Sequence, residues 1–139
     1  MKTIGLLGGM SWESSSTYYQ VINTATRGAL GGLHSAKSIM YSVDFAELEA
    51  LQAQGHWDAA ADLLIDAAQK VAKGGADFIL ICTNTMHKVA GQVAAAVKIP
   101  LLHIAEATGE ALRQAGVVRI YDYSHLILAG KALSAMPLP

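Results

Sequence analysis

The chain has 139 residues, which is enough for one domain with a hydrophobic core and too few for two ordinary domains. Charged residues make up 15% of the sequence and the net charge is −1, with no cluster of Lys and Arg, which excludes typical nucleic-acid and anionic-membrane partners. The single cysteine excludes an intrachain disulfide and fits a reducing compartment.

The first apolar run, residues 3–7, ends at Gly8 and Gly9 and predicts a buried strand followed by a turn. This run passes into polar sequence without an export-type cleavage site, and no stretch reaches the roughly 18 apolar residues of a membrane helix. We therefore expect a soluble cytoplasmic protein without a membrane partner. The glycines do not have the spacing of a dinucleotide-binding loop, so no nucleotide site is predicted.

The next elements have clear start signals. Ser11 is a good N-cap for a helix that ends before a pair of glycines. Residues 38–43 predict a second strand, and Asp44 predicts the cap of a short helix over about 45–53. The clearest helix is expected over 56–74, where apolar residues follow the 3.6-residue period.

A third buried strand is expected over 77–82, and small polar residues follow it. The remaining expected elements are a helix over 86–97, a strand over 101–104, a helix over 105–115, a strand over 117–120 and a weak helix over 124–136. This alternation predicts an α/β fold with a parallel sheet of four to five strands and helices on both faces.

The third strand ends in Cys82-Thr83-Asn84-Thr85, where a helix begins. In open α/β sheets ligands bind at this edge, and the first N–H groups of a helix attract anions. A thiol there can have a lowered pKa and act as nucleophile or proton acceptor, but a lone cysteine is often a small buried hydrophobe. The three polar residues suit a carboxylate, or one of them only caps the helix.

The histidines of the chain give two further predictions. His87 lies four residues after Thr83 and can share a helix face with it, although such a residue is often a partly solvated surface group. The histidines at 34, 56, 103 and 125 show no metal-ligand spacing with Cys82, so no metal is expected.

Two separated motifs give a resemblance to a known family. Gly5-Leu-Leu-Gly-Gly-Met-Ser-Trp-Glu-Ser14 and Cys82-Thr-Asn-Thr-Met-His87 resemble the aspartate/glutamate racemase family, in the branch of broad-specificity amino-acid racemases that includes aspartate racemases. The segments 30–35 and 43–45 are also similar to that branch. The resemblance covers about residues 1–119, which it implies are the N-terminal lobe, and it stops in a divergent tail over 120–139. A truncation with an altered reading frame and a natural short homologue are the two alternatives for this tail.

The resemblance implies racemisation without pyridoxal phosphate or any other cofactor. In that family two cysteines, one from each of two similar lobes, face opposite sides of the substrate Cα; one removes a proton and the other returns one. The implied partners are a small amino-acid substrate, aspartate or glutamate, and further copies of the chain in a homo-oligomer.

Site residues follow from the resemblance position by position. When the motifs are aligned on Asn84 and Thr85, which are implied to bind the α-carboxylate, the catalytic cysteine position falls on Thr83, with Cys82 one residue early. Met10 matches a loop position near the ligand, and Gln52 a position that touches the substrate side chain. Core packing is the alternative role for Met10, and a solvated helix end for Gln52.

The chain departs from the family pattern because it has no second cysteine. An inactive, truncated racemase lobe is therefore one expectation. A non-catalytic α/β domain that binds a small carboxylate or dimerises is another, and an isomerase or decarboxylase acting through Cys82 is the third.

Overall fold

The computed structural model describes residues 1–114, apart from the side chains of Leu112 and Arg113. Contacts within the chain group Met1–Ile104 as one compact unit, and a second unit begins at Ala105.

Strands and helices alternate along the described chain, as the sequence predicts. The elements are β1 (Ile4–Gly8), α1 (Trp12–Leu30), β2 (Ser38–Ser42), α2 (Phe45–Ala53), α3 (Trp57–Lys73), β3 (Phe78–Ile81), the 3₁₀ helix η1 (Thr85–Val89), α4 (Ala90–Ala95) and α5 (Ile104–Gln114). Two predicted caps are confirmed. The Ser11 hydroxyl accepts the Ser14 N–H of α1 at 3.1 Å, and the Asp44 carboxylate accepts the Ala46 N–H of α2 at 3.0 Å.

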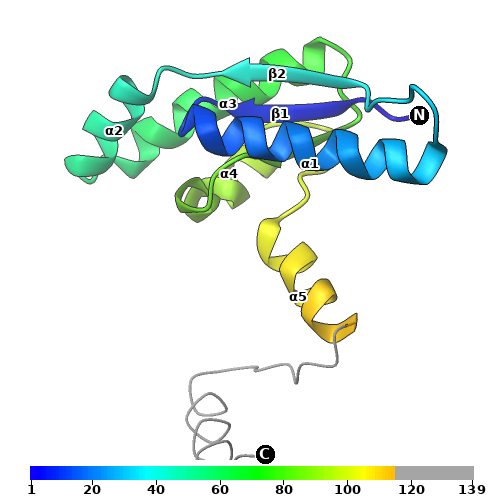
Figure 1. Cartoon of the computed structure of the whole chain (residues 1–139). Coiled ribbons are helices and arrows are strands. Elements are labelled where there is room, and N and C mark those ends of the chain that lie inside the picture. Colours follow the sequence, from blue (N-terminus) through cyan, green and yellow to red (C-terminus); the bar gives the residue numbers. More distant parts are fainter. Residues whose placement is uncertain (115–139) are drawn as a thin grey trace, which may run out of the picture. The chain divides into compact units, whose positions relative to one another are not determined.

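The sheet is parallel, with β1 between β2 and β3. Because side chains alternate along a strand, the two faces of the sheet carry different residues. Leu7, Tyr41 and Ile81 are in register on one face, where they join the core cluster that includes α3. Figure 1 shows α1 in front of β1 and α3 behind it, so helices cover both faces, as predicted.

The predicted number of strands is wrong for the described residues, which form a sheet of three strands rather than four or five. The segment expected as a strand over 101–104 makes only one bridge, between Leu101 and Ile79. Pro100 has no N–H to add to a ladder, and α5 already begins at Ile104, so no room for a longer ladder remains. The strand over 117–120 and the helix over 124–136 lie outside the described residues.

The helix expected over 86–97 is split into η1 and α4. In an α-helix the His87 N–H would bond to the Thr83 carbonyl, four residues back. Here the ring Nδ1 of His87 lies 2.7 Å from that carbonyl oxygen. The His87 N–H instead reaches the Asn84 carbonyl at 3.0 Å, three residues back, which is the 3₁₀ pattern.

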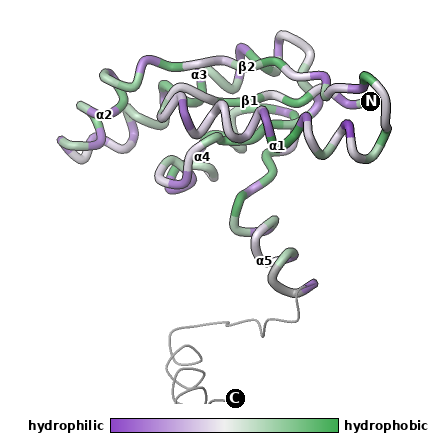
Figure 2. The backbone as a smooth tube through the Cα atoms, in the orientation of Figure 1, coloured by the Kyte–Doolittle hydropathy of each residue, from purple (hydrophilic) through white to green (hydrophobic). Residues whose placement is uncertain are grey.

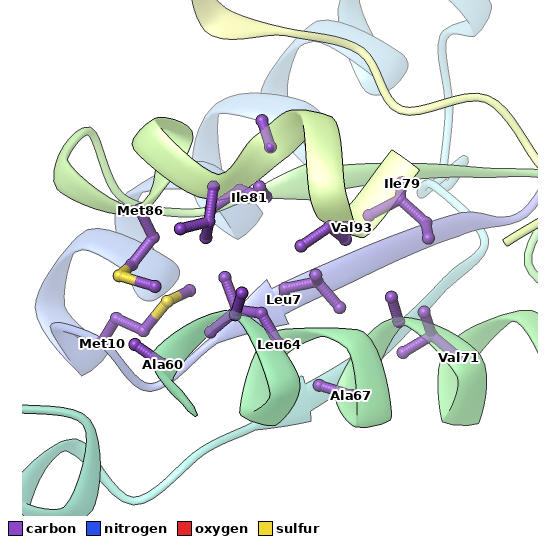
Figure 3. Packing of buried hydrophobic residues seen from close by; sticks show 14 of the residues in the cluster. Leu7, Met10, Ala60, Leu64, Ala67, Val71, Ile79, Ile81, Met86 and Val93 are labelled. Atoms are coloured by element: carbon purple, nitrogen blue, oxygen red, sulfur yellow. The ribbon is translucent and has the colours of Figure 1, made fainter. Parts of the chain in front are cut away.

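The core lies between the sheet and α3, η1 and α4. α3 buries six residues, whereas α1 buries only Ser15. Figure 3 shows Leu7, Leu64, Val71, Ile79 and Val93 interleaved in this core. Figure 2 shows hydrophilic and hydrophobic positions mixed along α1, while β1 carries no strongly hydrophilic position. The apolar character of the chain is therefore used mainly on the α3 side of the sheet.

Candidate active site

Three loops meet at the carboxyl edge of the sheet. Gly8 at the end of β1 is in register with Ser42 at the end of β2, and Leu7 is in register with Ile81 of β3. The loops continue this pairing. The Val43 N–H donates to the Gly8 carbonyl at 3.0 Å, and the Cys82 N–H donates to the Leu7 carbonyl at 2.9 Å. The topology thus brings the predicted residues after β1, β2 and β3 to one edge.

The loop after β1 is held tightly by its own backbone. Gly9 has a φ of 89°, and a Cβ there would lie 2.2 Å from the Val43 carbonyl oxygen. Only glycine allows this approach. The buried Ser15 hydroxyl accepts the Gly9 N–H and donates to the Ser11 carbonyl, both at 3.0 Å. Sequence reasoning missed Ser15, because a serine in the first turns of a helix carries no signal of burial.

Cys82 is buried beneath this edge and is not an accessible thiol. Its exposed fraction is 0%, and burial raises the pKa of its thiol to about 12. The pKa of Tyr18 is raised by burial and by the nearby Cys82 sulfur. The expectation of a lowered thiol pKa is therefore wrong, because desolvation outweighs any effect of the following helix. Sequence reasoning also missed the proximity of Tyr18, which lies on α1.

Thr83, Asn84 and Thr85 are the accessible residues at the join between β3 and η1. Thr83 is half-buried, and Asn84 and Thr85 are exposed. Asn84 occupies the N-cap position of η1, but its side chain makes no capping hydrogen bond. The alternative that Asn84 serves only as a helix cap is thus not supported, and its amide is available to a ligand.

His87 fixes the loop that carries Thr83. Its Nδ1 bonds to the Thr83 carbonyl at 2.7 Å, and its Nε2 accepts the Ile104 N–H at 3.3 Å. A carbonyl only accepts and an N–H only donates, so these partners assign the neutral tautomer with the proton on Nδ1. Burial lowers the pKa of His87, the Thr83 hydrogen bond opposes that effect, and His103, whose ring centroid lies 4.7 Å away, adds to it.

Met10 and Gln52 are linked through a residue that sequence reasoning missed. Met10 is buried in the core cluster, so its packing alternative describes its position in the structure. The Gln52 Nε2 donates to the Met86 sulfur at 3.0 Å. Figure 3 shows the side chains of Met10 and Met86 directed toward each other. Gln52 is half-buried rather than a solvated helix end, and it lies beside η1, which begins at Thr85.

Residues 1–114 contain no group of three or more His, Cys, Asp or Glu side chains that could hold a metal ion. In the same part of the chain, no helix is both long and apolar enough to cross a membrane.

The fold is an α/β domain in which accessible polar residues follow the end of a parallel strand. Comparison with known proteins gives the family. Residues 7–121 match the model of the Asp/Glu/hydantoin racemase family, and this chain belongs to that family.

A curated relative is the broad specificity amino-acid racemase RacX of Bacillus subtilis (strain 168). It is 32% identical over 108 residues, which cover 76% of this chain and 47% of the relative. This chain therefore spans about half the length of that relative.

Solved structures agree with this assignment. A crystal structure from Yersinia pestis, of a protein assigned to the Asp/Glu racemases, has a TM-score of 0.81 and 57% identity; the match covers 84% of this chain and 50% of that one. An aspartate racemase homologue from Pyrococcus horikoshii OT3 has a TM-score of 0.77 and 31% identity, with the same coverage of 84% and 50%. The aspartate racemase of Picrophilus torridus, at 18% identity and a TM-score of 0.64 over 86% of this chain and 79% of that one, shows the fold alone.

Proposed function

We propose that this chain provides one lobe of a racemase for acidic amino acids, aspartate or glutamate, that works by two-base proton transfer at Cα without pyridoxal phosphate. The observation that carries the proposal is the accessible run Thr83-Asn84-Thr85 at the carboxyl edge of a sheet in a member of the racemase family. We assign residues 1–119 to this lobe and residues 120–139 to a divergent tail.

The roles follow from accessibility and chemistry. Asn84 and Thr85 offer an amide and a hydroxyl to the α-carboxylate. Hydrogen bonds to this carboxylate spread its negative charge, so the carbanion that develops at Cα costs less free energy. Thr83 occupies the acid/base position beside them. Cys82 is the weaker candidate, because its buried thiol, with a pKa of about 12, supplies almost no thiolate at neutral pH.

A threonine hydroxyl is far less acidic than a thiol, so Thr83 is a poor base on its own. Two-base racemisation needs a second group on the other side of Cα. We place that group in a second lobe or in another copy of the chain, and the unequal bases would favour reaction of one enantiomer. A symmetric dimer of this chain would pair two Thr83 residues. A cytoplasmic homo-oligomer with a small amino-acid substrate fits this proposal.

One observation favours a second candidate function. Within the described residues the candidate site has no accessible thiol. A non-catalytic domain that binds a small carboxylate at Asn84 and Thr85 requires no base, so it is the alternative.

Proton exchange separates the two functions. The chain is incubated with L-aspartate or L-glutamate in deuterated water, and loss of the α-proton signal is followed by NMR. We expect exchange in the native chain and in Cys82→Ala, and a loss of at least about tenfold in Thr83→Ala. Carboxylate binding without exchange would support the non-catalytic domain, and exchange lost only in Cys82→Ala would contradict the assignment of Thr83.

A further inference from the structure

Met86 connects two parts of the candidate site that are far apart in sequence. We propose that Met86 is a positioning residue, which holds the Gln52 amide ready for the side chain of the bound amino acid. This inference rests on the racemase function proposed above and assigns a role to a residue outside the set matched to the family motifs.

A hydrogen bond connects Gln52 with Met86. The Gln52 Nε2, near the end of α2, donates to the Met86 sulfur at the start of η1 over 3.0 Å. Among the described residues this is the one hydrogen bond that the Gln52 side chain makes. The second N–H and the Oε1 of the amide therefore remain for a ligand.

Met86 can restrict the side chain of Gln52 because Met86 itself is held in the core. Its exposed fraction is 0%, and it belongs to the core cluster together with Met10. A glutamine side chain has three rotatable bonds, and ordering it on binding costs entropy. A buried acceptor that orders Gln52 in the free protein removes part of that cost and so raises affinity.

Met86 lies next to the residues that we propose bind the α-carboxylate. Met86 directly follows Thr85, and adjacent Cα atoms are about 3.8 Å apart. Gln52 is therefore bonded to the residue next to Thr85, where we propose that the α-carboxylate of the amino acid binds. The chemical group that Gln52 recognises is a hydrogen-bonding side chain on the substrate, such as a carboxylate or an amide.

The sulfur contributes something that packing alone does not need. Leucine fills nearly the same volume as methionine, and cores usually tolerate this exchange. Leucine has no acceptor, so Met86→Leu removes the hydrogen bond and keeps the core. Met40→Leu makes the same chemical change on β2, where the side chain is partly exposed, and serves as the matched control.

The first measurement needs no ligand. In a ¹⁵N-labelled chain, the side-chain amide signals of Gln52 are identified by their absence in Gln52→Ala. We expect Met86→Leu to move them to the positions of the exposed Gln54 and Gln69, and Met40→Leu to leave them in place. Unchanged Gln52 signals in Met86→Leu overturn the proposal.

The second measurement is binding. The affinity for L-glutamate should fall about three- to tenfold in both Met86→Leu and Gln52→Ala, with no further loss in the double variant. Affinity for L-alanine, whose side chain has no hydrogen-bonding group, should stay the same. Equal losses for glutamate and alanine would mean a packing role. If no amino acid binds the native chain, the racemase proposal and the recognition role both fail, while the amide signals still decide whether Met86 holds Gln52.

Discussion

At the scale of single residues, Cys82 shows how one position changes the chemistry of a side chain. Ile81 faces the core on the α3 side, so the next residue turns toward the opposite face of the sheet. There the thiol is fully buried, and the pKa of Tyr18 is affected by it. Thr83, one residue later, is half-buried and accessible. A single step along the chain therefore separates a core residue from a candidate acid/base.

The thiol of Cys82 should be almost inert in the folded protein. With its pKa raised to about 12, its thiolate fraction at pH 8 is about a thousandfold lower than that of a free cysteine. We expect modification by a thiol reagent at pH 8 to be slower by at least that factor in the native chain than in guanidinium. A native rate equal to the unfolded rate would contradict the buried position.

The same pKa shift has a consequence for stability. The unfolded thiol loses its proton above about pH 8.5 while the folded thiol keeps it, so the free energy of unfolding should fall as pH rises through this range. Cys82→Ala should remove this part of the pH dependence.

Gly9 should be the glycine that tolerates a side chain least at the candidate site. Its φ of 89° and the 2.2 Å approach of a Cβ to the Val43 carbonyl predict that Gly9→Ala costs at least about 2 kcal/mol of unfolding free energy. Gly28 lies within α1 with open space around it, so Gly28→Ala should stabilise by about 0.5–1 kcal/mol. Urea titrations of both variants test this pair, and equal effects would contradict it.

At the scale of elements, the join between β3 and η1 depends on His87. The ring takes the carbonyl that an α-helix would use, and its other nitrogen accepts a backbone N–H from Ile104. A protonated ring would present a second N–H to that donor. The loop that carries Thr83 is therefore held by the neutral form of one histidine.

Stability should depend on this histidine at mildly acidic pH. Because burial lowers the pKa of His87, the unfolded chain takes up a proton below about pH 6.5 before the folded chain does. The free energy of unfolding should fall as pH drops below 6.5, and less so in His87→Gln. His56→Gln, at an exposed position, is the control. Identical pH profiles of Tm for all three proteins would refute the role of His87.

At the scale of the whole molecule, the core is one-sided. α3 and α4 pack on a continuous apolar face of the sheet, whereas α1 buries a single serine. The stability of the described unit should therefore come mainly from the α3 side. α1 is the more polar of the two long helices, and its large apolar residues Trp12, Tyr19 and Val21 are exposed.

Core substitutions should report this asymmetry. Leu64→Ala on α3 removes a side chain that is 0% exposed, and should cost about 2–5 kcal/mol. Val21→Ala on α1 removes one that is 61% exposed, and should change stability by less than about 0.5 kcal/mol. Guanidinium unfolding of both variants measures the difference, and comparable losses would show that α1 is as well packed as α3.

The sequence by itself determined most of the elements, the parallel sheet and the edge where the candidate site lies. Local signals sufficed, since hydrophobic period and caps such as Ser11 and Asp44 act within a few residues. Only the tertiary structure decided which distant segments are joined by hydrogen bonds, such as Gln52 with Met86 and His87 with Ile104. Desolvation of Cys82 also depends on what packs over it. Such contacts depend on burial in three dimensions, which the spacing of residues along a chain does not encode.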